Sequence, residues 1–186
     1  LHLCDRRQRQ MCIRDSHLGD MLLVFEEETE FHRVGFYMIP WSMQKDRVLD
    51  RKFYRINSLA QVKIAGDMYP NCYGNGQTMR NGESANRMDY KSQKEVATEC
   101  GKEIHTYFED ARGYELENVI TYYHGEDSFE MKNIFTNKAE KKVSLEMLSS
   151  FEMGDISPFL EGIGTDALLV HRLRSNCLLY TSDAAD

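Results

Sequence analysis

The chain has 186 residues, a formal net charge of −7 at pH 7 and 41% hydrophobic residues. This length suits a single domain, and a mildly acidic chain disfavours nucleic acid, whose phosphates are bound by clustered Lys and Arg. No run of about 18 apolar residues occurs, so no membrane-spanning helix is predicted. We therefore expect neither a nucleic-acid nor a membrane partner.

Both ends of the chain look foreign to the rest. One DNA string, read in opposite orientations, encodes "RRQRQMCIRD" near the start and "CLLYTSDAAD" at the end. That string resembles the adapter of a transposase-based sequencing library. We interpret residues 1–16 as a disordered adapter-like artefact and residues 177–186 as a second one, and base the fold prediction on residues 17–176. The alternative is a basic N-terminal arm and a short tail.

The first part of the remaining sequence predicts short strands. In chain order these are "MLLVFEEE", "FHRVGFYMI" and "AQVKIAG", which are rich in β-branched and aromatic residues. Between the second and the third, "WSMQKDRVLDRKFYR" could hold one short helix. Nowhere does the sequence show a helical apolar stripe with caps.

The second part alternates with period two. "KEIHTYFED" places Ile104, Thr106 and Phe108 on one face, and "YELENVITYY" follows after a turn at Gly113. "FEMKNIFTN" comes next, and the polar "NKAEKK" is predicted to join it to "VSLEMLSSF" as a hairpin. "DALLVHRLR" is the last candidate strand. Strands that recur about every ten residues between turns predict an all-β, antiparallel β-sandwich.

One long loop, residues 66–87, separates the two parts. It is rich in Gly, Asn and Ser, and long irregular loops in compact domains are often functional. Its amides and Arg80 could bind sugar hydroxyls, while Tyr69 and Tyr73 could pack against sugar rings. The alternative is a solvated surface loop. Glycines that permit positive φ and close backbone approach are Gly74, Gly76 and Gly82.

Metal, thiol and acid chemistry have little support in the sequence. Cys72 and Cys100 lack CxxC spacing, and the histidines show no i,i+4 or HxH pattern, so no metal and no cofactor are expected. Free thiols fit a cytoplasmic protein. Glu115 and Glu117 lie on a strand face and are expected to be solvated. The single tryptophan, Trp41, is either a sugar platform or a half-buried packing residue.

Several stretches together resemble one enzyme family. "GDMYPNCYGNGQTMRN" and "RGYELENVITYY" are followed by "LEMLSSFEMGDISPF" at 145–159 and "LLVHRLRS" at 168–175. This set resembles the N-terminal region of bacterial α-galactosidases of glycoside hydrolase family 36, most clearly from Ile64 onward. The resemblance covers nearly all of residues 18–176.

The resemblance implies a β-sandwich, often called a supersandwich, that precedes a catalytic (β/α)₈ barrel. It implies hydrolysis of terminal α-D-galactosides of the raffinose or melibiose type, with retention through two barrel carboxylates about 5 Å apart. Those aspartates are expected downstream of Asn176, so no catalytic residue is assigned here and the fragment is expected to be inactive. The family also implies a homo-oligomer.

The resemblance also implies a binding role for the long loop. The matching segment is residues 69–81, and its substrate-binding candidates are Arg80, helped by Asn81 and Asp67. The alternative for Arg80 is a structural bridge between the loop and the barrel. Two other functions stay open for the domain as a whole: a stand-alone carbohydrate-binding β-sandwich module, and an interdomain scaffold of another glycosidase.

Overall fold

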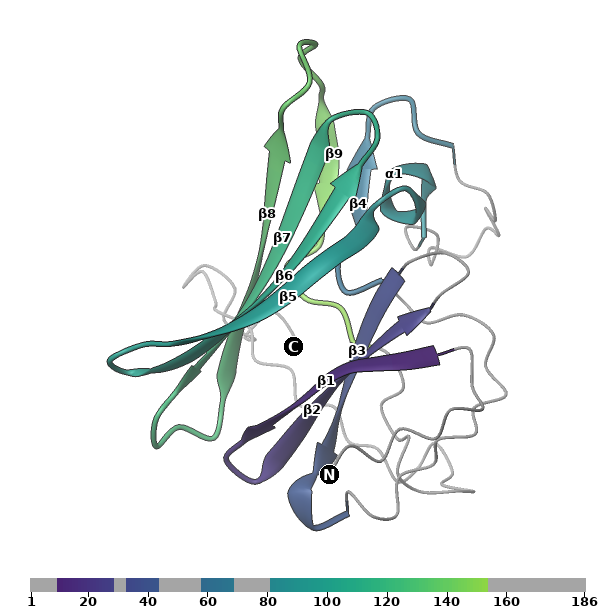
Figure 1. Ribbon diagram of the computed structural model, residues 1–186. Coiled ribbons are helices and arrows are strands. Elements are labelled where there is room, and N and C mark those ends of the chain that lie inside the picture. The colour runs from purple at the N-terminus through teal and green to yellow at the C-terminus, as the bar shows by residue number, and fades with distance from the viewer. Residues whose placement is uncertain (1–9, 29–32, 44–57, 69–80, 154–186) are drawn as a thin grey trace, which may run out of the picture.

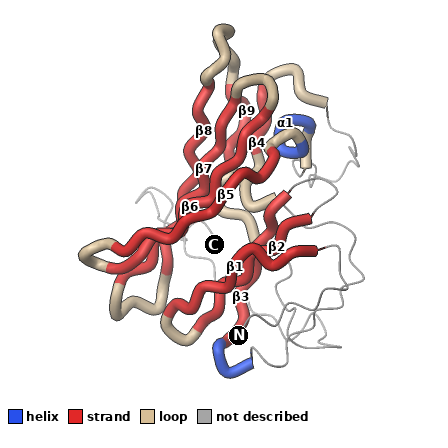
Figure 2. The backbone as a smooth tube through the Cα atoms, viewed as in Figure 1, coloured by secondary structure: helices blue, strands red, loops and turns tan. Residues whose placement is uncertain are grey.

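The computed structural model describes residues 10–28, 33–43, 58–68 and 81–153 (Figure 1). The described residues are mostly antiparallel strands, which confirms the predicted all-β class; Figure 2 shows how little helix accompanies them. The strands are β1 (Gln10–Leu18), β2 (Met21–Glu28), β3 (Arg33–Pro40), β4 (Val62–Ile64), β5 (Asp89–Ala97), β6 (Gly101–Asp110), β7 (Tyr114–Tyr123), β8 (Phe129–Asn137) and β9 (Leu145–Leu148). The helical turns are η1 (Trp41–Met43) and α1 (Glu83–Asn86).

The largest sheet has four strands in the order β5–β6–β7–β8, so neighbours in sequence are neighbours in space. Its β6–β7 pair runs without a bulge from Gly101↔Tyr123 to Asp110↔Tyr114. The turn between these strands contains Gly113 at φ 90°, as the sequence predicts. The predicted strands "FEMKNIFTN" and "MLLVFEEE" coincide with β8 and β2.

A second sheet of three strands has the order β1–β2–β3. Strand β1 pairs with β2 from Gln10↔Glu28 to Leu18↔Met21, with one irregularity in the register. The expectation that residues 1–16 are disordered is therefore wrong for residues 10–16, which form most of β1. Sequence composition could not show this, because β1 is held by its backbone pairing with the edge of β2, which depends on the register of two strands. The adapter-like origin of the segment stays a prediction.

The smallest sheet joins distant parts of the chain. β4 pairs with β9 from Val62↔Leu148 to Ile64↔Leu145. The predicted hairpin through "NKAEKK" is wrong, because β9 leaves the edge of β8 and pairs with β4 instead. The turn "NKAEKK" itself remains polar and is held by Asn137, whose Oδ1 accepts a hydrogen bond from the Ala139 N–H at 2.9 Å.

The core lies between the sheets. The predicted face of β6 is buried there, with Ile104 and Phe108 no more than 2% exposed, and Leu116 and Ile120 of β7 beside it. Side chains of β2, β3, β4 and α1 complete the same cluster. Phe36 of β3 reaches Phe129 of β8 edge-on, with 6.2 Å between ring centroids. Apolar burial across two facing sheets is the packing of a β-sandwich.

The structure describes only part of the two segments that were expected to be irregular or helical. The predicted helix at "WSMQKDRVLDRKFYR" begins with the three residues of η1, and its remainder lies outside the described residues. The long loop contains one helical turn, α1, which the sequence did not predict. Of the helices in the described ranges, none has the length and apolar character needed to cross a membrane.

Candidate functional site

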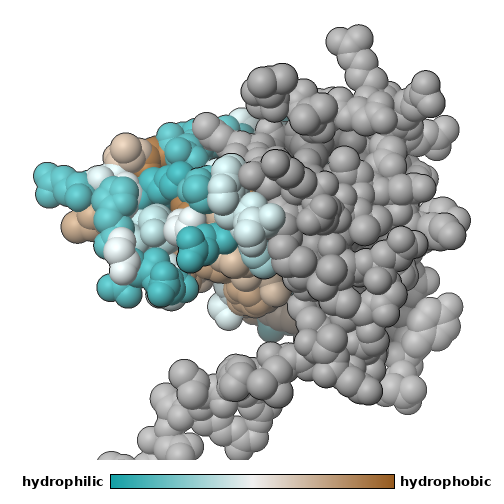
Figure 3. Space-filling model, turned by 90° about the horizontal axis from the view of Figure 1, so that it is seen from below, coloured by the Kyte–Doolittle hydropathy of each residue, from teal (hydrophilic) through white to brown (hydrophobic). Residues whose placement is uncertain are grey.

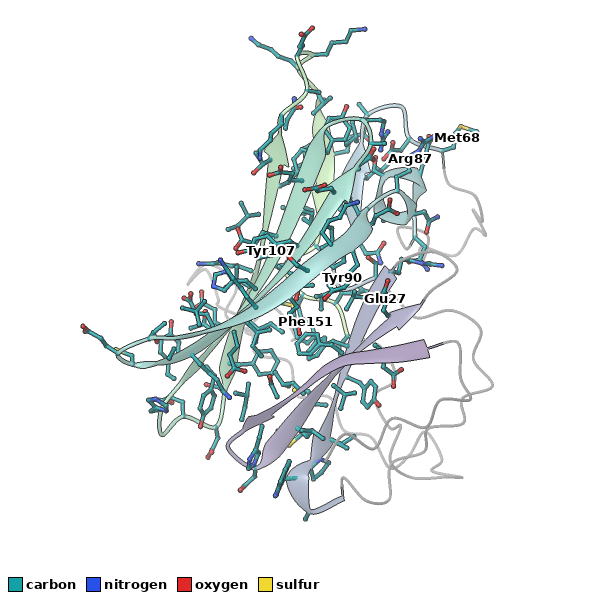
Figure 4. The ribbon with its side chains drawn as sticks, in the orientation of Figure 1. Glu27, Met68, Arg87, Tyr90, Tyr107 and Phe151 are labelled. Atoms are coloured by element: carbon teal, nitrogen blue, oxygen red, sulfur yellow. The ribbon has the colours of Figure 1, made fainter. Side chains whose placement is uncertain are left out.

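The base of the long loop is a closed stem beside α1. The Glu83 N–H donates to the Met68 carbonyl at 3.2 Å, and the Met68 N–H donates to Glu83 Oε2, also at 3.2 Å. The hydrogen bond that the carboxylate accepts from the Met68 N–H, with a further one from Arg87, holds the pKa of the Glu83 carboxyl below its usual value. Met68 and Arg87 lie beside α1 in Figure 4. The stem brings residues 68 and 83 together, so it closes the segment 69–80.

The three predicted binding residues are placed differently with respect to this stem. Arg80 lies outside the described residues. Asp67 is inside the stem, with a side chain only 5% exposed. Its Oδ2 accepts a hydrogen bond from the Ile64 N–H at 2.8 Å, and its Oδ1 lies 3.7 Å from Arg112 Nη1. Asp67 therefore stabilises the backbone at the end of β4.

Arg112 connects three segments below the loop. Its Nη2 donates to Asp110 Oδ2 at 2.6 Å and to Ser84 Oγ at 2.8 Å, while Nη1 approaches Asp67. The guanidinium also lies 5.1 Å from the centroid of the Tyr114 ring. The hydrogen bonds to Asp110 are the main reason that the pKa of Arg112 is raised. A planar guanidinium suits this role, because it can satisfy several acceptors at fixed angles.

Asn81, and not the neighbouring Gly82, has a positive φ. Its φ is 51°, whereas Gly82 has an extended backbone with φ −63° and ψ 174°. Gly74 and Gly76 lie outside the described residues. Asn tolerates this region better than most residues, because its short side chain can hydrogen-bond locally. Gly82 does not use the freedom to adopt a positive φ, and Asn81 makes the turn into α1.

Asn81 is also one end of a polar chain that crosses the domain. The Asn81 N–H donates to Gln61 Oε1 at 2.7 Å, and the Gln61 N–H donates to Ser149 Oγ at 2.8 Å. The Ser149 carbonyl accepts from Asn133 Nδ2 at 2.6 Å, and Asn133 Oδ1 accepts from Asn118 Nδ2 at 2.7 Å. The loop base is thereby linked to strands β7 and β8.

These supporting residues were missed by sequence reasoning. Arg112 stands in a polar turn, where a charged residue ordinarily indicates a solvated surface. Asn118 did carry a signal, because the period-two pattern of β7 places this amide on the core face. A polar side chain at a core position needs a partner. The sequence could have flagged that need, but it could not have named Asn133 as the partner.

The outer face of the four-stranded sheet carries a histidine between two carboxylates. His105 Nδ1 lies 2.6 Å from Glu117 Oε1, and Nε2 lies 2.9 Å from Glu103 Oε2. Each ring nitrogen of His105 therefore faces one carboxylate oxygen, and the tautomer decides which nitrogen donates. Glu117, expected to be solvated, is in fact a histidine partner. Glycosidase chemistry needs room for a sugar between its carboxyls, whereas here His105 occupies that space.

A pocket of about 540 Å³ opens at the other end of the sandwich from the loop stem. It is lined by residues of the β1–β2 turn and of the β7–β8 turn, both of which lie at the lower left of Figure 1. Viewed from below, apolar surface shows among polar residues of the described part (Figure 3). The residues that line the pocket are Leu18, Gly19, Asp20, Met21, Leu23, Met38, Tyr122, Glu126, Asp127, Ser128 and Phe129.

Trp41 stands next to this pocket without lining it. Its backbone N–H donates to the carbonyl of Asp20 at 2.7 Å, and its ring stacks on His17 with centroids 3.9 Å apart. The residue is 40% exposed. His17 covers one ring face while the residue as a whole is exposed, so both the sugar-platform and the packing interpretation of Trp41 stay predictions.

Metal and thiol chemistry can be assessed for the described residues alone. Within them, no group of three or more His, Cys, Asp or Glu is arranged to hold a metal ion. Cys100 is a free, exposed thiol in the turn between β5 and β6, and Cys72 lies outside the described residues.

No family model, no curated protein and no solved structure matches this chain.

Proposed function

We propose that this chain is the non-catalytic N-terminal β-sandwich of a retaining α-galactosidase of glycoside hydrolase family 36. The observation that carries the proposal is the sequence set "LEMLSSFEMGDISPF" and "LLVHRLRS", together with the loop "GDMYPNCYGNGQTMRN". The antiparallel all-β fold supports it, because the resemblance requires such a fold. A β-sandwich alone does not specify function, so the motifs bear the weight of the proposal.

In this proposal the parent enzyme hydrolyses terminal α-D-galactosides and the present residues do not. Two aspartates of a (β/α)₈ barrel, encoded downstream of Asn176, act as nucleophile and acid/base. The sandwich packs on the barrel and supports a homo-oligomer. Arg80, in the segment 69–81 that matches the family's loop, hydrogen-bonds substrate hydroxyls or shapes the mouth of the substrate pocket. Asp67 and Asn81 support Arg80 by holding the loop base, because their described contacts are to the protein itself.

The decisive test is to recover the coding sequence beyond Asn176 from the source DNA and to express the extended protein. Hydrolysis of raffinose and of an aryl α-galactoside by the extended protein, and none by the 186-residue chain, is the expected result. A downstream sequence without a barrel that carries two suitable aspartates would overturn the proposal. Galactose titration of the present chain then separates a sugar-binding module, which shifts Trp41 fluorescence, from a scaffold, which does not.

The loop is tested in the same extended protein. Arg80→Ala is expected to raise KM for raffinose by about tenfold, since a charge-assisted hydrogen bond to a substrate contributes roughly 1.5 kcal/mol. Arg87→Ala is the matched control, because Arg87 pairs with Glu83 on the outside of the stem. Equal kinetics for the Arg80 variant and the wild type would exclude the substrate role and favour a structural bridge.

A further inference from the structure

The pocket between the β1–β2 and β7–β8 turns has no part in the proposed function. Its volume of about 540 Å³ falls within the ordinary range for small-molecule sites, roughly 300–1,000 Å³. The two turns that form its mouth come from opposite sheets. The site therefore exists only when the two sheets are packed face to face.

The interior and the mouth of the pocket differ in chemistry. Leu18 and Leu23 are at most 5% exposed, and the flexible side chain of Met38 packs against the same core. Rings of Tyr122 and Phe129 form the wall on the β7–β8 side. A surface of this kind binds hydrocarbon, because apolar area is removed from water on both partners.

The charge of the lining has one sign. Asp20 stands on one side of the mouth and Glu126 and Asp127 on the other, all exposed, and no Lys, Arg or His is among the lining residues. Carboxylates of one sign around an apolar wall focus a negative potential on the opening. The aromatic rings of Tyr122 and Phe129 add to this, because their faces attract cations.

We propose that this pocket binds an amphipathic organic cation, a molecule with a hydrocarbon or aromatic body and an ammonium group. The body enters the apolar interior, and the ammonium stays at the mouth between the three carboxylates. A bare metal ion is the wrong ligand, since within the described residues these carboxylates are not grouped as metal ligands and much of the lining is apolar. The proposal does not depend on the α-galactosidase assignment.

The test uses the 186-residue chain and three probes of similar shape and different charge. These are phenethylammonium, neutral 2-phenylethanol and anionic 3-phenylpropionate. Binding is followed by ring signals of Tyr122 and Phe129 in NMR and by the fluorescence of Trp41, whose backbone is bonded to Asp20. At low salt we expect a dissociation constant on the order of 1 mM for the cation, affinity at least about fivefold weaker for the alcohol, and no binding of the anion.

Matched charge variants assign the effect to the mouth. Asp20→Asn/Glu126→Gln/Asp127→Asn is expected to weaken binding of the cation about tenfold, because it removes three exposed charge contacts that are each of modest strength. The control is Glu109→Gln/Glu115→Gln/Glu140→Gln, which removes the same number of charges at the far end of the four-stranded sheet. The control variant is expected to keep the wild-type affinity.

Salt provides a test that needs no variant. Raising the ionic strength from about 0.02 M to about 0.5 M shortens the screening length and is expected to weaken the cation severalfold, with no loss for the alcohol. Equal affinity for cation and alcohol, or equal losses in the two triple variants, would overturn the proposal. So would the absence of cation binding at low salt. If the pocket variant fails to fold, the probe series and the salt dependence still decide.

Discussion

Arg112 shows how one side chain can hold together parts of the chain that are far apart in sequence. It contacts Asp110 two residues before it, Ser84 in α1 and Asp67 beyond β4. The two carboxylates are nearly buried, with Asp110 1% and Asp67 5% exposed. A carboxylate in such a place needs a cation or hydrogen-bond donors, because burial removes its hydration.

Removing that cation should destabilise the fold. For Arg112→Met we expect the free energy of unfolding to fall by about 2 kcal/mol, less than the roughly 3–5 kcal/mol of a fully buried broken pair, because water reaches the Arg112 side chain. Urea unfolding of both proteins at pH 7 measures the difference.

The matched variant is Arg87→Met, whose ion pair with Glu83 is largely exposed. It should unfold at nearly the same urea concentration as the wild type, since exposed pairs add little stability. Equal free energies of unfolding for the two variants would contradict this prediction. They would show that the contacts of Arg112 add no more stability than an exposed ion pair.

The close pairing of β6 with β7 requires a glycine at position 101, and this requirement is visible only once the two strands are paired. Gly101 begins β6 opposite Tyr123, and a Cβ at this position would lie 1.8 Å from the carbonyl oxygen of Tyr122. Backbone atoms of β7 cannot move aside without breaking the ladder. Gly101 is therefore needed for close approach of two strands, and not for a left-handed turn.

The corresponding prediction compares two glycines. Gly101→Ala should lower the free energy of unfolding by roughly 2–3 kcal/mol, in the range of overpacking at a rigid site. Gly82→Ala is the control, since nothing lies within 4 Å of its Cβ position and its φ is −63°. Thermal unfolding of both variants decides, and a Gly101 variant as stable as the Gly82 variant would mean that the β6–β7 end opens at little cost.

A second element-scale feature is the polar chain that runs from Asn81 to Asn118. Asn118 is fully buried, and its Nδ2 has Asn133 Oδ1 as acceptor. Asn133 also binds the Ser149 carbonyl just past β9. This series of hydrogen bonds links the β4–β9 sheet to the four-stranded sheet. It stands in place of the backbone pairing between β8 and β9 that the predicted hairpin would have formed.

Asn133→Ala should cost about 2 kcal/mol of folding free energy, because it leaves a buried amide donor and a carbonyl unsatisfied. Thr136→Ala, on the exposed face of the same strand, should change stability little. Hydrogen exchange gives a second measurement, in which the amides of β9 should lose protection in the Asn133 variant more than those of β6. Unchanged exchange in β9 would show that this sheet is held by β4 alone.

At the scale of the whole molecule, the three sheets depend on each other at their edges. β1 covers one edge of β2, and Ser16 reaches the other sheet, donating to Glu95 Oε2 at 3.1 Å. Without β1, the backbone groups of β2 would be exposed along its length. An open edge of this kind promotes pairing with a second molecule.

A chain that lacks residues 1–15 should therefore unfold at a lower urea concentration and associate at high protein concentration. A chain that lacks only residues 1–9 keeps β1 and is the control. Sedimentation velocity reports the association, and urea unfolding reports the stability. Equal behaviour of the two shortened chains would show that β1 adds nothing, which is the outcome that the adapter-like interpretation of residues 1–16 expects.

The sequence alone was sufficient for most of the described strands and for the faces of β6 and β7, but it did not predict β1 or β5. Alternation in "KEIHTYFED" and "YELENVITYY" places Ile104, Phe108 and Leu116 in the core, because successive side chains of a strand point to opposite faces. The turn at Gly113 is equally local, since only a few residues set its backbone angles. Such features depend on neighbours in the chain, and a single sequence contains those neighbours.

Only the tertiary structure decided which strands pair and what the loop residues contact. β9 pairs with β4 across more than eighty positions, Asp67 is held by Arg112, and the pocket mouth joins turns from two sheets. For each of these contacts, the local sequence would allow several other partners equally well. The choice is made by burial and hydrogen bonding of the whole packed domain, and no periodicity in the chain records it.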